Sequence, residues 1–184
     1  AKDIEDFKTS AKSKGGYYLA RYEASYRDET RPYSKPSTGT PRASADEALT
    51  EGMLWNFITQ KEAATVSKNM YTNNVFESDL MNSYSWDTAI VFIQTYSGDS
   101  DYSKQASINK SMSNTGANGD QKCNINDMAS NCAEWSTETS AYTTIPCTYR
   151  GGCYYYPNFY TSFRQLRQQD LPLPAIGFRT LIYM

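Results

Sequence analysis

Histidine is absent from this 184-residue sequence. Its absence removes the most common general base and metal ligand, and with it every Ser-His or Cys-His nucleophile pair. The chain also lacks a Lys/Arg run, and its 18 basic and 20 acidic residues give a net charge of -2. We therefore expect no nucleic-acid-binding surface. No apolar run reaches the ~18 residues of a membrane span and no signal peptide is recognisable, so membrane insertion is not expected.

Cysteine occurs in only one part of the chain, at Cys123, Cys132, Cys147 and Cys153. No Cys-x-x-Cys pair is present and no histidine is available to complete a tetrahedral site, so zinc is not predicted. Because no secretion signal is visible, we expect buried thiols that pack as small apolar side chains. Two disulfides, in any of three connectivities, are the alternative.

Tyrosine is frequent, with 16 copies against 7 Phe and 3 Trp. Aromatic residues are common in strands and cores, which accounts for part of this number. Tyrosine also provides a large contact area at low cost in side-chain entropy, so the remainder suggests a recognition surface.

The length fits one domain with a substantial core. We predict a polar N-terminal lead-in over residues 1–14 and a single domain over 15–184. Aromatic and apolar residues indicate a strand over 17–24, whereas the proline-rich stretch 30–45 indicates a surface loop. The polar Ser/Asn/Gly-rich stretch 100–121 predicts an exposed, mobile loop.

The first predicted helix follows a short buried extended segment at residues 53–58. Thr59 and Glu62 have the spacing of a capping box, in which each side chain bonds the other residue's backbone N–H. The pattern therefore predicts a helix over residues 61–70.

A second helix is predicted from apolar periodicity. Trp86, Ile90 and Ile93 recur at i, i+4 and i+7 and would form one buried face. Ser85 is the expected N-cap, and Gly98 is the expected end of the helix.

Three segments in the last third carry unusual combinations of residues. Residues 123–135 read Cys-Asn-Ile-Asn-Asp-Met-Ala-Ser-Asn-Cys-Ala-Glu-Trp, residues 150–152 read Arg-Gly-Gly, and residues 177–179 read Gly-Phe-Arg. Asp127 and Asn131 are turn formers whose side chains can bond nearby backbone amides. The two glycines predict a backbone conformation or a close approach that a Cβ atom would block.

Two strands and two arginines are predicted around these segments. Glu134 and Trp135 begin a strand with a large core residue, and alternation over residues 177–183 predicts a final strand buried on at least one face. Arg150 and Arg179 are expected to pair with acids such as Glu134.

This ordered set of motifs resembles the formylglycine-generating-enzyme family, which has a variant of the C-type lectin fold. The resemblance covers most of the chain from about residue 15. It implies an α+β fold in which two helices pack on small antiparallel sheets with long irregular loops. Three departures from the family pattern occur. Ser130 stands where the family usually has glycine, Cys132 stands where it usually has an apolar residue, and Cys153-Tyr154 stands where it has Ser-Trp. Each exchange keeps a small or an aromatic residue at its position.

Catalytic members of that family do not match this chain in the residues they require. The resemblance implies that the catalytic members oxidise a cysteine of their substrate, using two cysteines of their own in the stretch just before the terminal Gly-Phe-Arg. In this chain residues 154–184 contain no cysteine. A related iron-dependent branch uses histidine ligands, which are absent. We therefore expect no catalytic residue and no copper-thiolate site. A formylglycine-generating-type oxidase that modifies sulfatases is kept as an alternative function.

Variable proteins of diversity-generating retroelements, including phage tropism determinants, share the fold of this family. The resemblance implies that the region between Arg-Gly-Gly and Gly-Phe-Arg, here residues 153–176, is a hypervariable ligand-binding surface. We expect a protein or glycan receptor on another cell or particle, and display on a virion or cell surface. A non-diversified structural domain of a surface or prophage protein is the other alternative. The residues predicted to contact the ligand are Tyr154, Tyr155, Tyr156, Asn158, Phe159, Tyr160, Thr161, Phe163, Leu166, Gln168, Asp170, Leu171 and Leu173.

Calcium is the one cofactor that the side-chain inventory leaves open. Asn124, Asn126, Asp127 and Glu134 carry oxygen atoms of the type that calcium prefers. Hydrogen-bonded turn residues are the favoured interpretation of this group, so no cofactor and no metal site are predicted.

Overall fold

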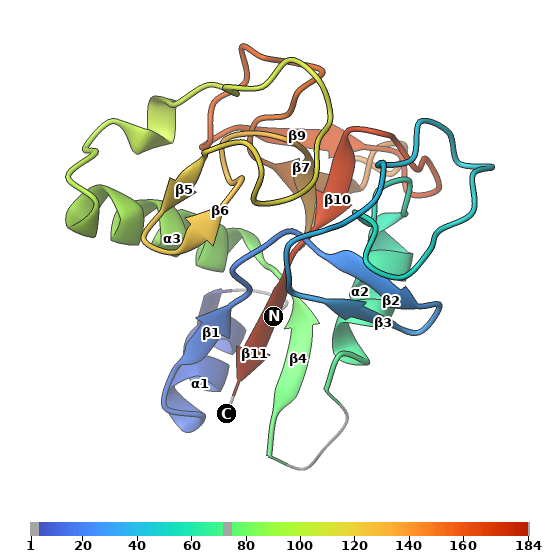
Figure 1. Ribbon diagram of the computed structural model, residues 1–184. Coiled ribbons are helices and arrows are strands. Elements are labelled where there is room, and N and C mark those ends of the chain that lie inside the picture. The colour runs from blue at the N-terminus through green and yellow to red at the C-terminus, as the bar shows by residue number, and fades with distance from the viewer. Residues whose placement is uncertain (1–3, 72–74, 184) are drawn as a thin grey trace.

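Three α-helices and one short 3-10 helix form in the computed structural model, which describes residues 4–71 and 75–183 (Figure 1). The helices are α1 (Ile4–Ser13), α2 (Gln60–Lys68), α3 (Ser83–Tyr96) and η1 (Tyr102–Lys104). The strands are β1 (Tyr17–Leu19), β2 (Ser25–Asp28), β3 (Arg31–Tyr33), β4 (Glu77–Leu80), β5 (Gln121–Lys122), β6 (Ile125–Asn126), β7 (Ala133–Thr139), β8 (Cys147–Arg150), β9 (Arg164–Arg167), β10 (Ile176–Phe178) and β11 (Thr180–Tyr183). The α+β class predicted from the sequence is confirmed.

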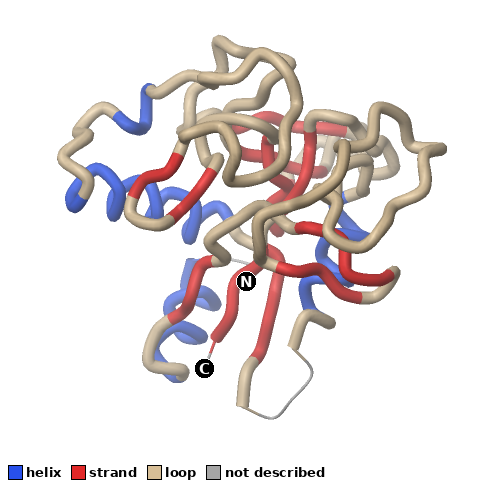
Figure 2. Tube along the Cα trace, in the orientation of Figure 1, coloured by secondary structure: helices blue, strands red, loops and turns tan. Residues whose placement is uncertain are grey.

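The strands form small sheets in different parts of the molecule. The order β1-β11-β4 makes an antiparallel sheet, and β10-β7-β8-β9 makes a larger one. Two short ribbons, β2-β3 and β5-β6, complete the set. Figure 1 shows β1, β11 and β4 at one end of the molecule, and Figure 2 shows that the irregular segments gather at the other end, around the larger sheet.

The predicted final strand is divided between the two main sheets. Ile176 to Phe178 pair with β7 in parallel, and Thr180 to Tyr183 pair with β1 and β4 in antiparallel fashion. Arg179 lies at the junction. The small sheets are otherwise antiparallel, as predicted, and β10 is the strand that joins the larger sheet in parallel, after the long connection that follows β9.

Caps of the predicted type begin both predicted helices. Thr59 and Glu62 form the expected capping box of α2, with Thr59 N donating to Glu62 Oε2 at 2.9 Å. In α3 the N-cap is Asn82, not Ser85. Ser85 is instead the third helical residue, and its N–H donates to Asn82 Oδ1 at 2.9 Å. Asn and Ser are both favoured N-cap residues, so residue type alone does not distinguish Asn82 from Ser85 as the N-cap of α3.

Helix α1 was not predicted, since most of residues 1–14 was interpreted as a lead-in. Its only buried side chain is Phe7, which packs edge-on against Tyr17 at 5.1 Å between ring centroids. Glu5 and Asp6 in the first turn and Lys12 in the last turn complement the helix dipole. A single buried residue produces no periodic signal, which explains the error. Residues 1–3 lie outside the described part.

The core consists of two apolar clusters beside the main sheets. One contains Trp55, Trp135 and Phe178, with Trp55 and Phe178 in a T-shaped contact at 5.6 Å between ring centroids. The other contains Trp86 and Ile93 of α3 together with terminal-strand residues. The Trp/Ile face predicted for this helix is therefore core. Within the described residues no helix has the length and apolar character that crossing a bilayer requires.

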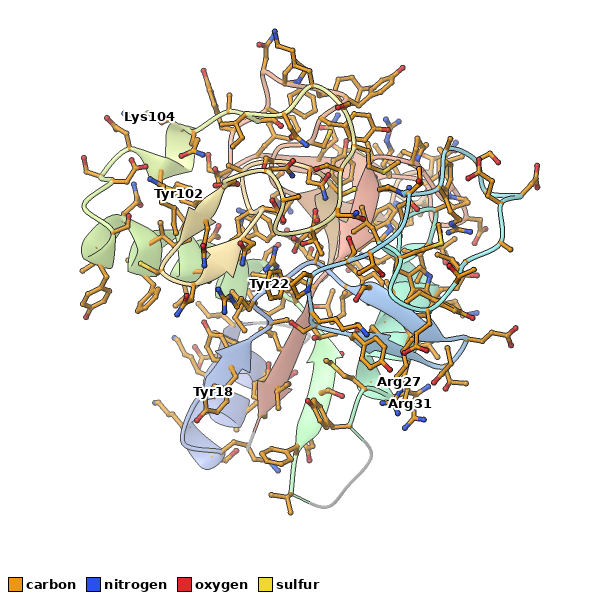
Figure 3. All side chains as sticks on the ribbon, in the orientation of Figure 1. Tyr18, Tyr22, Arg27, Arg31, Tyr102 and Lys104 are labelled. Atoms are coloured by element: carbon orange, nitrogen blue, oxygen red, sulfur yellow. The ribbon has the colours of Figure 1, made fainter. Side chains whose placement is uncertain are left out.

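The stretch 100–121 is irregular apart from η1 and the start of β5, but it is not exposed along its whole length as predicted. Tyr102, Thr115 and Asp120 within it are buried. Tyr102 points beneath the loop, where its hydroxyl donates to Asp120 Oδ1 at 3.2 Å, whereas Lys104 points outward (Figure 3). Polar composition misled the prediction, because these polar side chains bond one another inside the molecule rather than water.

Candidate ligand-binding surface

A buried ion pair lies beneath the predicted surface. We call its residues, Glu134 and Arg179, together with the buried Glu23, the frame. Arg179 Nη2 lies 2.7 Å from Glu134 Oε1, and its Nε lies 3.1 Å from both carboxylate oxygens of Glu134. The same guanidinium donates to the carbonyl oxygens of Ala20 and Asn126. Both charged side chains are 0% exposed. The predicted pairing of Arg179 with Glu134 is confirmed, and it joins β7, β6 and the segment after β1 at one point.

Glu23 is a second fully buried carboxylate in this region. Its oxygens accept hydrogen bonds from Asn131 Nδ2 at 2.6 Å and from the Cys132 amide at 2.9 Å. Burial raises its pKa well above the ordinary value, and the negative charges of Asp127 and Glu134 add to the rise. The 123–135 motif is thus connected to the N-terminal part of the chain through this side chain.

Asp127 and Asn131 have the turn role predicted for them. Both adopt positive φ angles, of 63° and 59°. Asp127 accepts from the Thr115 hydroxyl at 2.9 Å and from the Gly116 amide at 2.5 Å, and Asn131 Oδ1 accepts from the Ser113 amide at 3.0 Å. The backbone partners come from the loop before the motif, so the motif anchors that loop.

The calcium alternative does not fit the donor atoms. The oxygens of Asp127 accept protein N–H and O–H groups, and those of Glu134 are paired with a guanidinium. Across the part of the chain that the structure describes, no group of three or more acidic, cysteine or histidine side chains is arranged to hold a metal ion.

The two glycines of the Arg-Gly-Gly motif let the backbone pack closely against the segment around Met128 and Ala129, beneath the predicted surface. A Cβ atom on Gly151 would lie 2.8 Å from the carbonyl oxygen of Met128, and one on Gly152 would lie 2.5 Å from that of Ala129. Gly151 also has a φ of +86°. The need for glycine predicted from the sequence is therefore confirmed. Arg150 does not reach Glu134; it pairs with Asp87 of α3 and donates from Nε to the Phe163 carbonyl at 3.2 Å.

Residues 154–163 form an irregular segment that is fastened at several points. The Tyr154 amide donates to the Asn131 carbonyl at 2.9 Å, and the Ser162 amide donates to the Ser103 carbonyl at 3.1 Å. A bridge pairs Ala106 with Tyr160. Figure 1 shows this segment beside the 100–121 loop, at the end of the molecule away from α1 and β11.

The aromatic side chains of this segment touch one another in a series, which we call the ring surface; its members are Tyr154, Tyr155, Tyr156, Phe159 and Phe163. Successive ring centroids lie 6.2, 5.0, 4.9 and 3.8 Å apart, and the last pair is stacked. Tyr155 is 62% exposed, and the neighbouring Tyr160, outside the series, is 50% exposed. The structure therefore brings these predicted residues together, with Tyr155 and Tyr156 facing solvent and Tyr154, Phe159 and Phe163 partly buried.

Thr161 is a correction to the predicted ligand contacts. It is fully buried, its hydroxyl and its amide both donate to the Gln105 carbonyl, and its own carbonyl accepts from Trp86 Nε1 at 2.9 Å. It anchors the segment and is closed to a ligand in this structure. Position between two motifs cannot separate an anchor from its exposed neighbours.

The other predicted contact residues differ in exposure. Asn158, Gln168 and Asp170 are exposed, while Leu166, Leu171 and Leu173 are partly buried. Leu173 and Tyr154 pack against the first core cluster. Asn158 lies within the segment of the ring surface, whereas Leu166, Gln168, Asp170, Leu171 and Leu173 lie on β9 or on the connection from β9 to β10.

A cavity of about 290 Å³ lies next to the ring surface and was not predicted. Its lining includes Tyr149, Cys153, Tyr155, Tyr156, Arg167 and Leu173. Burial raises the pKa of the Tyr149 hydroxyl, and the positive charge of Arg167 opposes the rise. Sequence reasoning placed Arg167 inside the variable region but did not select it; the period-two pattern of Gln165 and Arg167 on a strand was the available signal.

All four cysteines are free thiols in the structure, and three of them are buried. Burial raises the pKa of the thiols of Cys132, Cys147 and Cys153. The predicted role as small buried side chains therefore holds for Cys132, Cys147 and Cys153, whereas Cys123 is only partly buried.

Comparison with known proteins places this architecture in a fold class. No protein-family model matches the sequence, and no curated protein matches it. Among solved structures, PvdO from Pseudomonas aeruginosa has a TM-score of 0.62 at 10% identity, covering 91% of this chain and 80% of its own. The Major Tropism Determinant U1 variant has a TM-score of 0.54 at 12% identity, covering 91% of this chain and 50% of its own.

CarF has a TM-score of 0.51 at 13% identity, covering 69% of this chain. This chain corresponds to 58% of the CarF chain and to half of the tropism determinant. At these identities the likeness concerns the fold. The protein has the C-type-lectin-like fold that the sequence motifs predicted, with α1 as a third helix.

Proposed function

We propose that this protein is a ligand-binding variable protein of the diversity-generating-retroelement type, displayed on a virion or cell surface. The ring surface, with Tyr160 and the exposed residues up to Leu173, contacts a protein or glycan receptor on another cell or particle. The fold shared with a tropism determinant supports this proposal.

One observation carries the proposal: large aromatic rings are exposed on a segment whose backbone is held in place. Tyr155, Tyr156 and Tyr160 are all exposed, although apolar area of this size gains free energy when it leaves water. The amides of Tyr154, Thr161 and Ser162 are all bonded to other segments. A partner that covers the rings therefore has little backbone ordering to impose.

The arrangement in space suits display. The end of β11 and helix α1 lie at one end of the molecule, and residues 154–163 lie at the other (Figure 1). Attachment through the end that holds α1 and β11 would leave the ring surface free to meet a receptor.

A catalytic role is not part of the proposal. The chain contains no histidine, and residues 154–184 contain no cysteine. Burial raises the pKa of the thiols of Cys132, Cys147 and Cys153, whereas nucleophilic and metal-binding cysteines act as thiolates.

Sequencing gene copies within one population tests the diversified character of the surface. We expect substitutions to cluster between Arg150 and Gly177 and to fall mostly on exposed positions, sparing Thr161, Gly151 and Gly152. Substitutions spread evenly along the chain would contradict the proposal.

Receptor contact is tested by replacing exposed tyrosines. The triple variant Tyr155→Ala, Tyr156→Ala and Tyr160→Ala is expected to lose at least about 30-fold in binding of the labelled protein to receptor-bearing cells, since a desolvated ring is worth ~2 kcal/mol or more. Tyr96→Ala and Tyr142→Ala, at similarly exposed tyrosines outside residues 154–163, are the matched controls. Equal binding by the triple variant and the controls would show that the ring surface is not the contact.

A further inference from the structure

The cavity beside the ring surface combines apolar walls with one cationic side chain. Tyr155 and Tyr156 border it on the side of the ring surface, and Leu173 to Ile176 border it on the side of the connection to β10. Its volume of about 290 Å³ accommodates a side chain or a small organic group.

Arg167 differs from the other arginines of the C-terminal third. Arg150, Arg164 and Arg179 each have a carboxylate partner, in Asp87, Glu138 and Glu134 respectively. Among the residues that the structure describes, none places a carboxylate within ion-pair distance of Arg167.

The position of Arg167 on β9 keeps its guanidinium close to the cavity. Arg167 pairs with Cys147 in the register of β8 and β9, so its side chain lies on the same sheet face as that of Tyr149, and both residues line the cavity. Its Nε is buried and has no hydrogen-bond partner. A half-buried guanidinium without a counter-charge, next to an open apolar cavity, favours an anionic guest.

The rest of the lining distinguishes between kinds of anion. Most of the lining is apolar or aromatic, and Arg167 is the charged side chain in it; the other lining residues are Ala133, Tyr149, Cys153, Tyr155, Tyr156, Leu173, Pro174, Ala175 and Ile176. A sugar would leave most of its hydroxyl groups unpaired against such walls, which is costly. An aliphatic stem ending in a carboxylate matches both the walls and the charge.

We infer that this cavity binds a carboxylate carried on a short aliphatic stem, supplied by an acidic side chain of a partner protein, and that Arg167 pairs with the carboxylate. The inference deepens the proposed function and rests on it for the origin of the guest. Tyr155 and Tyr156 both belong to the ring surface and line the cavity, so one partner would cover the rings and insert the acidic side chain.

Binding of small probes to the intact protein tests the cavity without the receptor. Hexanoate, its neutral analogue hexanamide and N-acetylneuraminate are titrated separately while backbone amide NMR shifts are followed. We expect hexanoate to shift the amides of Tyr155, Ala175 and Ile176 and to bind about tenfold more tightly than hexanamide, because a hydrogen bond to a charged group is stronger than one to a neutral group. Equal binding of hexanoate and hexanamide would overturn the pairing, and stronger binding of N-acetylneuraminate would overturn the protein origin of the guest.

Two arginine variants assign the charge effect to one residue. Arg167→Gln should weaken hexanoate binding about tenfold and leave hexanamide binding unchanged, which also reports that the cavity is intact. Arg164→Gln, on the same strand but exposed, should change neither. An equal loss in both variants would mean that general charge attraction, not the cavity, is responsible. If Arg167→Gln does not fold, the comparison of hexanoate with hexanamide on the unmodified protein still decides the matter.

The two proposals can fail separately. If the triple tyrosine variant keeps its receptor binding while hexanoate still shows the Arg167-dependent preference, the proposed function fails and the cavity remains an acid-binding site. If receptor binding is lost but hexanoate shows no preference, only the cavity inference fails.

Discussion

The frame around Arg179 and the segment that carries the ring surface distribute polar and apolar groups in opposite ways. In the frame, Glu23, Glu134 and Arg179 are fully buried and hydrogen-bonded. In the segment, Tyr155 and Tyr160 face solvent. Both regions lie in the C-terminal third of the chain or contact it directly. Their different burial of polar and aromatic side chains therefore reflects different roles and not different positions in the chain.

The comparison shows how stability and recognition are divided between the two regions. A buried charge is tolerated only when its partners are in place, so the frame accepts few changes of sequence. Exposed rings contribute little to folding, and their replacement leaves no cavity and no unpaired charge. A surface of this kind can change its residues while the fold beneath it persists.

The largest expected effect is a loss of stability when the buried guanidinium of Arg179 is removed. Arg179→Leu would leave Glu134 charged, buried and unpaired, and should lower the free energy of unfolding by about 3–5 kcal/mol. Denaturant titration followed by tryptophan fluorescence measures the change.

The matched control is Arg164→Leu, which removes the exposed pair with Glu138. An exposed ion pair is worth about 1 kcal/mol or less. If the two variants lose equal stability, the distinction between the frame and the surface does not hold.

A smaller effect is expected in the pH dependence of stability. The pKa of Glu23 is raised in the folded protein, so the folded state binds more protons than the unfolded state above the ordinary value of 4.5. Stability should therefore be full below that pH and decline as the pH rises through the folded-state pKa.

Unfolding titrations between pH 4 and pH 8 measure this decline, and Glu23→Gln should make the curve flatter. Glu51→Gln, at an exposed carboxylate, serves as the control and should leave the curve unchanged. A curve for Glu23→Gln that falls as steeply as that of the unmodified protein would sink this account of the frame.

The smallest effect on stability is expected at the ring surface. Tyr155→Ala should change the free energy of unfolding by no more than about 0.5 kcal/mol, because the side chain is mostly exposed. Thr161→Val, at the buried anchor of the same segment, should cost more, since its hydroxyl hydrogen bond to the Gln105 carbonyl is lost. The reverse order, measured by thermal unfolding, would contradict the separation of anchors from contact residues.

Local patterns predicted those parts of the molecule whose partners are close in sequence or chemically unmistakable. The Thr59–Glu62 capping box, the buried face of α3 and the glycines at 151 and 152 were all predicted correctly. Helix α1 and the buried character of Tyr102 and Asp120 were missed. In those cases a single contact, or a network between polar side chains, replaces the periodic apolar pattern on which prediction depends.

The sequence by itself determined the fold class, the element types in most of the core and the stretch in which exposed aromatics would be concentrated. Only the tertiary structure decided which residues of that stretch face outward, that Thr161 faces inward, and that Arg167 lies beside a cavity with no carboxylate partner among the residues that the structure describes. The reason is physical: propensity and periodicity act over a few neighbouring residues, whereas burial and charge pairing depend on segments that meet from distant parts of the chain.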